Sequence, residues 1–152
     1  MATAVRQPDL SAYFDRSVSK TEISKTASTY TESDIFSLYT SPDLTHQIGN
    51  YILDIKAYIQ SNVEVAREIN TIVSLPFGTL SAQRTDRFRS TLTPISEVGP
   101  NIPSPNSFAL SNEILIYTIL SGNEDFIGSN GYVTITTNNT SIRRLDIWLN
   151  KQ

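Results

Sequence analysis

The feature that most constrains the fold of this chain is the stretch from Pro42 to Leu75, which Pro76 ends. Ser41 is a favourable N-cap, proline is tolerated at the first position of a helix, and the carboxylate of Asp43 suits the first turn. Apolar residues then recur with helical spacing. With Ile48 as the first position of a heptad, the positions on one side are Ile48, Tyr51, Ile52, Ile55, Tyr58, Ile59, Asn62, Val65, Ala66, Ile69, Ile72 and Val73.

This spacing predicts one long amphipathic helix over about residues 42–75, roughly 50 Å in length. The apolar stripe is wider than a two-stranded coiled-coil seam and is typical of a helix that faces a core or a bundle. Asn62 falls within the stripe, where a single polar residue can fix the register between helices. We therefore expect a coiled-coil-like helix that binds partner chains; the alternative is an internal core helix of a monomer.

The segments around this helix differ from it in composition. Residues 1–31 have sparse apolar positions among Ser, Thr and Lys and predict an extended arm, which a short helix from Thr31 follows. Residues 76–112 contain five prolines and predict an irregular connector. Residues 113–150 predict a small antiparallel sheet, with strands at 113–120, 131–137 and 142–149. The expected fold is one α+β domain over residues 32–152, preceded by the arm.

Two further features are candidate contact sites. Arg84, Arg87 and Arg89 form a basic cluster in the connector, which is suited to an acidic protein partner, to a nucleic-acid backbone or to a solvated loop. Trp148 is either covered by the arm or an exposed interface anchor. The predicted partner-binding residues are Ile48, Tyr51, Ile55, Tyr58, Asn62, Ile69, Ile72, Arg84, Arg87, Arg89 and Trp148.

Composition and motifs argue against several classes of function. The net charge of −3 is unfavourable for nucleic-acid binding, and the chain has no Cys and only one His. No nucleotide, hydrolase or metal motif is present, so we expect no enzyme activity, metal, cofactor or small-molecule substrate. No run is apolar enough to span a membrane, and the N-terminus has no signal-peptide pattern. We therefore expect a cytoplasmic protein, or a virion protein if the chain is viral.

The remaining indication is compositional. The chain has 19 Ser, 17 Thr and 11 Asn with few charges, which suits wide protein–protein contact surfaces. In this respect it resembles the virion and tail components of bacterial viruses. The leading hypothesis is a structural subunit of a multi-chain particle, such as a viral tail, neck or capsid accessory, that forms homo-oligomers or binds other structural proteins. The alternative is a ligand-binding module, either an adhesin or a carbohydrate-recognition element.

Overall fold

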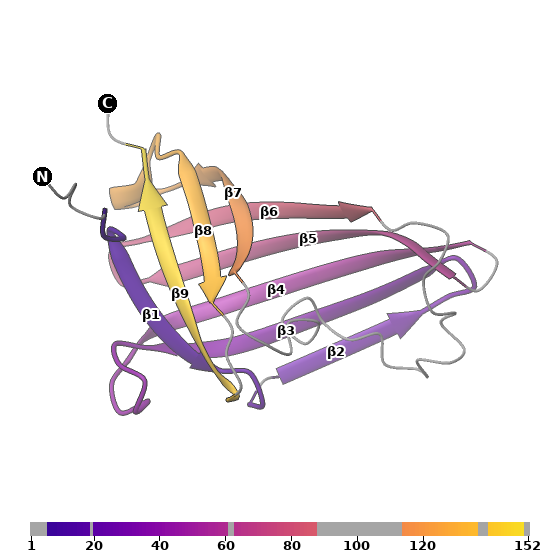
Figure 1. Ribbon diagram of the computed structural model, residues 1–152, viewed down its shortest axis with the longest axis horizontal. Helices are drawn as coiled ribbons and strands as arrows, with labels where there is room; N and C mark the ends of the chain where they lie inside the picture. The colour runs from indigo at the N-terminus through magenta and orange to yellow at the C-terminus, as the bar shows by residue number, and fades with distance from the viewer. Residues whose placement is uncertain (1–5, 19, 61–62, 88–113, 137–139, 151–152) are drawn as a thin grey trace, which may run out of the picture.

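The computed structural model describes residues 6–18, 20–60, 63–87, 114–136 and 140–150 (Figure 1). These residues form nine β-strands and one short 3-10 helix, η1, and contain no α-helix. The strands are β1 (Leu10–Asp15), β2 (Lys20–Lys25), β3 (Thr29–Tyr39), β4 (Gln47–Gln60), β5 (Val63–Leu75), β6 (Gly78–Arg87), β7 (Ile114–Gly122), β8 (Gly131–Thr136) and β9 (Ile142–Leu149), and η1 spans Glu124–Phe126.

All nine strands belong to one antiparallel sheet that closes into a barrel. The order is β1-β9-β8-β7-β6-β5-β4-β3-β2, and the ring closes where Tyr13 of β1 pairs with Tyr39 of β3. Eight strands make the ring, while β2 pairs with β3 beyond the point of closure. In Figure 1 the long strands β3–β6 extend beyond the wall that β7, β8, β9 and β1 form across them. No helix in the described part of the chain has the length and apolar character needed to cross a membrane.

The two longest strands, β4 and β5, alternate between an inner and an outer face. Alternate side chains of each strand are buried, and the residues between them are half-buried or exposed. This is the period of two that an extended backbone imposes. The buried positions are Tyr51, Leu53, Ile55, Ala57 and Ile59 on β4, and Arg67, Ile69, Thr71, Val73 and Leu75 on β5.

The predicted long helix is therefore wrong, and with it the coiled-coil-like helix and the α+β fold class. The stretch is rich in Ile, Val, Tyr and Thr, whose branched or aromatic side chains favour strands. Its outer face carries apolar residues such as Ile52 and Ile72 among charged ones, so a helical spacing could be found within it. The heptad stripe combined inward residues such as Ile55 with outward ones such as Ile52, and it left out the fully buried Leu53. β4 and β5 are the two strands of an antiparallel pair.

The expected flanking segments also need correction. The N-terminal arm contains β1 and β2, which pair with β9 and β3, and the short helix expected from Thr31 is instead part of β3. The predicted connector begins with β6, and its residues 88–112 lie outside the described residues. β7, β8 and β9 lie where three strands were predicted, but they belong to the barrel rather than to a small separate sheet.

The interior of the barrel is mainly apolar. Inward side chains from all eight strands of the ring make one continuous core. Part of it is an aromatic cluster in which the ring of Phe14 lies 4.9 Å from that of Phe36 and 5.2 Å from that of Tyr51, measured between centroids. These contacts join β1, β3 and β4 close to the point where the ring closes.

The barrel predicts which of two neighbouring residues carries more stability. We expect Leu53→Ala to lower the free energy of unfolding by about 2–5 kcal/mol, because it removes a fully buried side chain from the inner wall. Ile52→Ala should cost less, because Ile52 is half-buried on the outer face. Urea denaturation measures both. A long helix would reverse the order, since Ile52 would lie in its apolar stripe and Leu53 would face solvent.

A polar cluster on the inner wall of the barrel

Three polar side chains of β3 lie on the side of the sheet that faces the core, and one of them, Tyr30, belongs to a small buried cluster separate from the main core. Tyr30, Glu32 and Asp34 occupy alternate positions of the strand and are all buried, with Glu32 exposed to 9%. Because side chains alternate along a strand, they lie on the same face as the core residues Phe36 and Leu38. The first half of β3 thus places phenol and carboxyl groups where the second half places apolar side chains.

Arg67 of β5 completes this group, and its side chain has no exposed surface. Tyr30 pairs with Ala57 of β4, which in turn pairs with Arg67, so the three residues form one row across the sheet. The small side chain of Ala57 separates the two large ones. We refer to Tyr30, Glu32, Asp34 and Arg67 together as the polar cluster.

Hydrogen bonds link the members of the polar cluster along β3. The Tyr30 hydroxyl donates to Glu32 Oε1 at 2.8 Å, and the Thr21 hydroxyl of β2 donates to Asp34 Oδ1 at 2.7 Å. The carboxyl groups of Glu32 and Asp34 are also hydrogen-bonded to each other. A second carboxyl group in such contact disfavours the ionised form of Glu32.

This arrangement changes the acidity of the polar cluster. Burial raises the pKa of Glu32 to about 7, and the hydrogen bond with Asp34 adds to the rise, while Tyr30 and the charge of Arg67 oppose it. Burial, followed by the bond to Glu32, also raises the pKa of Tyr30. At neutral pH, Tyr30 is therefore an uncharged donor. Glu32 divides its population between the acid and the carboxylate, so it can both give and accept a proton.

Two further phenol groups extend this polar region into the barrel. Tyr51 of β4 and Tyr117 of β7 are fully buried. Burial raises the pKa of Tyr51 well above its usual value, and the phenol of Tyr117 and the charge of Asp34 add to the rise. Buried polar side chains are therefore found on β3, on β4 and on β7.

Burying these groups opposes folding unless they have partners. A barrel of this size could fill the same positions with apolar side chains, as it does at Phe36, Ile55 and Ile69. Buried ionisable groups whose pKa is strongly shifted are concentrated at functional sites. The polar cluster is therefore the candidate site.

The structure divides the predicted partner-binding residues among several places. Tyr51, Ile55 and Ile69 point into the interior, and Ile48 packs against the same core. Tyr58 and Ile72 are half-buried on the outer face, and Arg84 is half-buried on β6 opposite Ile69. Asn62 and Arg89 lie outside the described residues, and only the backbone of Arg87 is described. The described positions therefore lie on both faces of the sheet, and their role in binding a partner stays a prediction.

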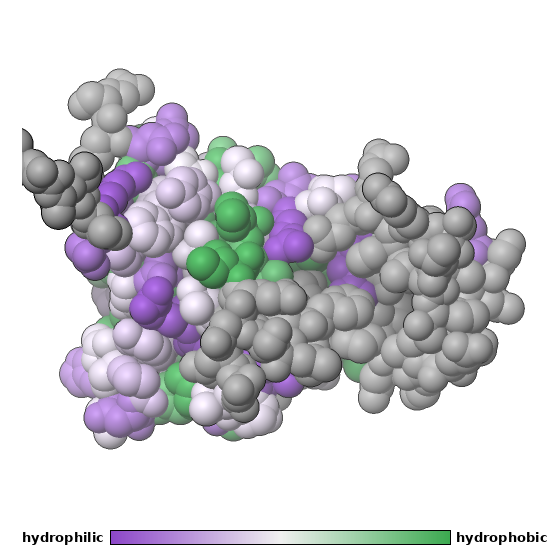
Figure 2. All heavy atoms as spheres, in the orientation of Figure 1, coloured by the Kyte–Doolittle hydropathy of each residue, from purple (hydrophilic) through white to green (hydrophobic). Residues whose placement is uncertain are grey.

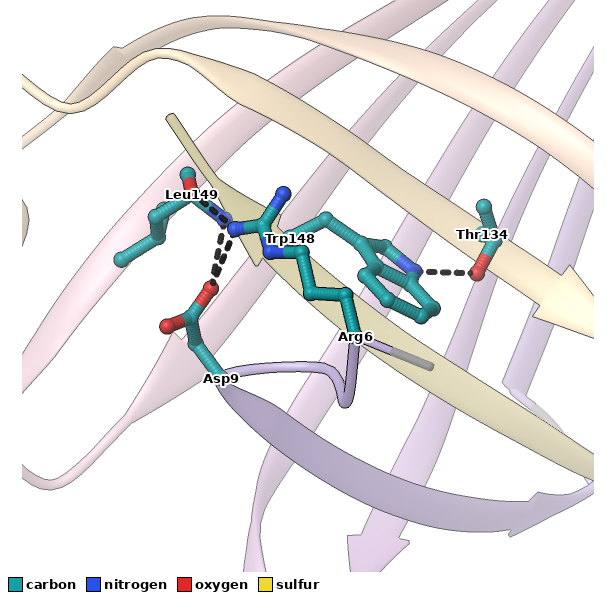
Figure 3. A network of polar contacts seen from close by, with 5 residues as sticks. All are labelled: Arg6, Asp9, Thr134, Trp148 and Leu149. Atoms are coloured by element: carbon teal, nitrogen blue, oxygen red, sulfur yellow. Dashed lines mark hydrogen bonds and ion pairs between the residues drawn. The ribbon is translucent and has the colours of Figure 1, made fainter. Parts of the chain in front are cut away.

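Trp148 is covered by the N-terminal segment (Figure 3). The Arg6 guanidinium lies 5.8 Å from the centre of its ring, and Tyr132 stacks beside it with 5.9 Å between ring centroids. The indole N–H donates to the Thr134 hydroxyl at 2.9 Å. Arg6 also donates to the carbonyl of Leu149, so these contacts fasten the start of the described chain to its last strand.

An exposed apolar stripe follows the outer face of β7. Ile114, Ile116 and Leu120 each have more than half of their surface exposed. Figure 2 shows the hydrophobic patch that they contribute to over this strand. Association of the chain with further copies, which the sequence analysis expects, stays a prediction.

Sequence reasoning missed the polar cluster although one signal for it was present. Tyr30, Glu32, Asp34, Phe36 and Leu38 alternate with residues that, apart from Ile35, are small and polar, which is the period of a strand with one buried face. The partnership with Arg67 could not be found in this way, because it depends on the register between strands. Among the described residues, no group of three His, Cys, Asp or Glu side chains could hold a metal ion.

Comparisons with known proteins support the fold, and they do not identify a function. No protein-family model matches the sequence. No curated protein matches it. Among solved structures, the chain is similar to one named pyocyanin demethylase, with a TM-score of 0.59 and 10% sequence identity, over 93% of this chain and 98% of that chain. At this identity the similarity shows a shared fold alone.

The hypothesis of a virion structural subunit is wrong. It depended on an apolar helix flank that would need partner chains to cover it. The residues of that flank are divided between the two faces of strands, and the inward ones are covered by the barrel itself. The similar solved structure is named as a demethylase and not as a virion component. The alternative of a ligand-binding module agrees better with these findings.

The raised pKa of Glu32 predicts how stability changes with pH. The folded state binds this proton more tightly than the unfolded state, whose ordinary glutamate pKa is near 4.5. The stability contributed by the bound proton is therefore complete below pH 4.5 and is lost as the pH rises to about 7. Between pH 5 and pH 8 the wild type should lose about 1–3 kcal/mol more than Glu32→Gln. Urea denaturation at several pH values measures this difference.

Glu68→Gln is the matched control for this measurement. Glu68 accepts a hydrogen bond from Tyr58 at 3.0 Å on the outer face, so it has the same type of partner as Glu32. Its pH profile should follow that of the wild type. Identical profiles for Glu32→Gln and the wild type would show that Glu32 titrates normally.

Proposed function

We propose that this protein is a ligand-binding barrel that holds a small organic molecule against the polar cluster. The observation that carries this proposal is the buried group of Tyr30, Glu32, Asp34 and Arg67 on a mainly apolar inner wall. Small-molecule sites combine a mainly apolar lining with a few convergent polar groups, and the interiors and mouths of β-barrels are common positions for them.

The chemistry of the polar cluster indicates what kind of molecule it recognises. Tyr30 offers a hydroxyl, and the Glu32–Asp34 pair offers both a proton and carboxylate oxygens. Ile55 and Ile69 lie in the same row of the sheet as Glu32 and provide an apolar surface next to these groups. A ligand that fits both is partly apolar and carries a polar group that can accept and donate hydrogen bonds.

A second candidate function is catalysis of proton transfer by the same residues. The observation that favours it is the pKa of Glu32 of about 7, which is the range in which a general acid or base works well at neutral pH. The sequence contains no recognised catalytic motif, and binding alone needs no turnover. Incubating the protein with a bound compound and analysing the products by mass spectrometry separates the two candidates.

Binding can be tested with pyocyanin as the first probe, since the protein of similar fold is named for it. A panel of other planar aromatic compounds extends the test. We expect at least one compound to bind in isothermal titration calorimetry, and Glu32→Gln and Tyr30→Phe each to weaken it by about tenfold, because each removes a buried hydrogen-bonding group.

The outer face offers matched controls for both substitutions. Tyr58→Phe and Glu68→Gln break a tyrosine–glutamate hydrogen bond that is chemically the same but lies outside the barrel. These variants should bind within about twofold of the wild type. If all four substitutions had equal effects, or if compounds bound without any dependence on Glu32 and Tyr30, the polar cluster would not be the binding site.

A further inference from the structure

The exposed apolar stripe on β7 lies in the middle of a part of the outer wall whose described residues carry no charge (Figure 2). β6, β7 and β8 are neighbours in the sheet, so their outward side chains form one surface. On β7 these side chains are Ile114, Ile116, Thr118 and Leu120, and all four are exposed. We infer that this surface, which we call the neutral face, binds a second copy of the chain to form a symmetric dimer.

The neutral face differs in charge from the outer wall beside it. Neither β7 nor β8 contains a charged residue. Where β6 pairs with β7, the outward residues of β6 are Ser81 and Gln83, and all charged residues of β6 follow Gln83. By contrast, the outer face of β4 and β5 carries Asp54, Lys56 and Glu68.

The composition of the neutral face is that of the centre of a protein–protein interface. Ile114, Ile116 and Leu120 are each more than half exposed, and hydroxyl and amide groups surround them. Interface centres are depleted of charged residues in the same way. Exposed apolar residues that are scattered singly are common on protein surfaces, but these three follow one strand. Covering them removes apolar surface from water and takes no charge out of solvent.

A second copy suits the neutral face because two such faces are complementary in charge. Neither brings a charge that the other would have to neutralise. A strongly charged partner would lose hydration here without meeting an opposite charge. The whole chain has a net charge of −3, so copies repel each other in general, and this repulsion is weakest where both surfaces are uncharged.

A twofold axis would bring the stripes of two copies together in opposite directions. With the axis between Ile116 and Thr118, Ile114 of one copy meets Leu120 of the other, and Ile116 meets Thr118. Both apolar ends of the stripe are then covered by apolar side chains. Every contact in such an interface occurs twice, so one substitution changes both sides of it.

The size of the neutral face indicates a weak dimer. β7 has nine residues. With three neighbouring strands about 14 Å wide, the flat area of the face is at most roughly 400 Å² for each copy. Stable complexes bury about 800 Å² for each partner. We therefore expect reversible association with a Kd on the order of 10–100 µM.

The test is sedimentation equilibrium of the intact protein over a range of concentrations that spans this Kd. The average mass should rise from that of one chain, 16.9 kDa, towards twice this value. Ile116→Lys should weaken association by at least about tenfold, because it brings like charges together near the axis. Ile116 is more than half exposed, so this variant should fold as the wild type does.

Ile35→Lys is the matched control, because Ile35 is another exposed isoleucine on the outer wall but lies on β3. This variant should associate as the wild type does. A wild type that stays monomeric at every concentration would overturn the inference and leave the stripe to a partner of another kind. Equal weakening by the two substitutions would also overturn it.

A second measurement locates the contact. The chain has no cysteine, so Ile116→Cys and Ile35→Cys each introduce a single thiol. Because stacked sheet faces lie about 10 Å apart, a short bismaleimide should crosslink Ile116→Cys into dimers at least about fivefold faster than Ile35→Cys. Equal rates would contradict an interface on β7.

Discussion

The structure depends on the alternation of side chains along strands that are closed into a ring. β3 is the strand on which this arrangement depends most. It pairs with β4 along its length on one side and with β2 and β1 on the other. Its Tyr39 takes part in closing the ring, and its Tyr30, Glu32 and Asp34 line the inner wall. A shift of one residue in its register would turn these groups outward and bring Thr31 and Ser33 into the core.

The polar cluster is compatible with a folded barrel because burial changes the charge of one of its members. Burial raises the pKa of Glu32 to about 7, so Glu32 is divided between the acid and the carboxylate at neutral pH, and the charge of Arg67 favours the carboxylate. Fully ionised groups in the same positions would oppose folding more strongly. The proton of Glu32 also makes the site chemically useful, because it can be donated to a ligand or recovered from one.

The sequence predicted the strands of the last third of the chain, because β-branched runs and turn residues leave few alternatives there. It misassigned β4 and β5, because strands with apolar residues on both faces contain helical spacings by chance, and Pro42 and Pro76 happened to mark plausible helix ends. The alternation of buried positions at Tyr30, Glu32 and Asp34 is visible in the sequence, but it was not recognised as the pattern of a strand. Neighbours across strands, such as the row that aligns Tyr30, Ala57 and Arg67, depend on register and closure, which local patterns do not encode.

The central claim is that Glu32 is a buried acid that holds its proton up to about neutral pH. The most direct test is a pH titration of side-chain carboxyl carbons by 13C NMR spectroscopy, with Glu32 assigned by comparison with Glu32→Gln. The structure predicts that the Glu32 resonance shifts with a midpoint near pH 7. A Glu32 midpoint near 4.5 would contradict the account.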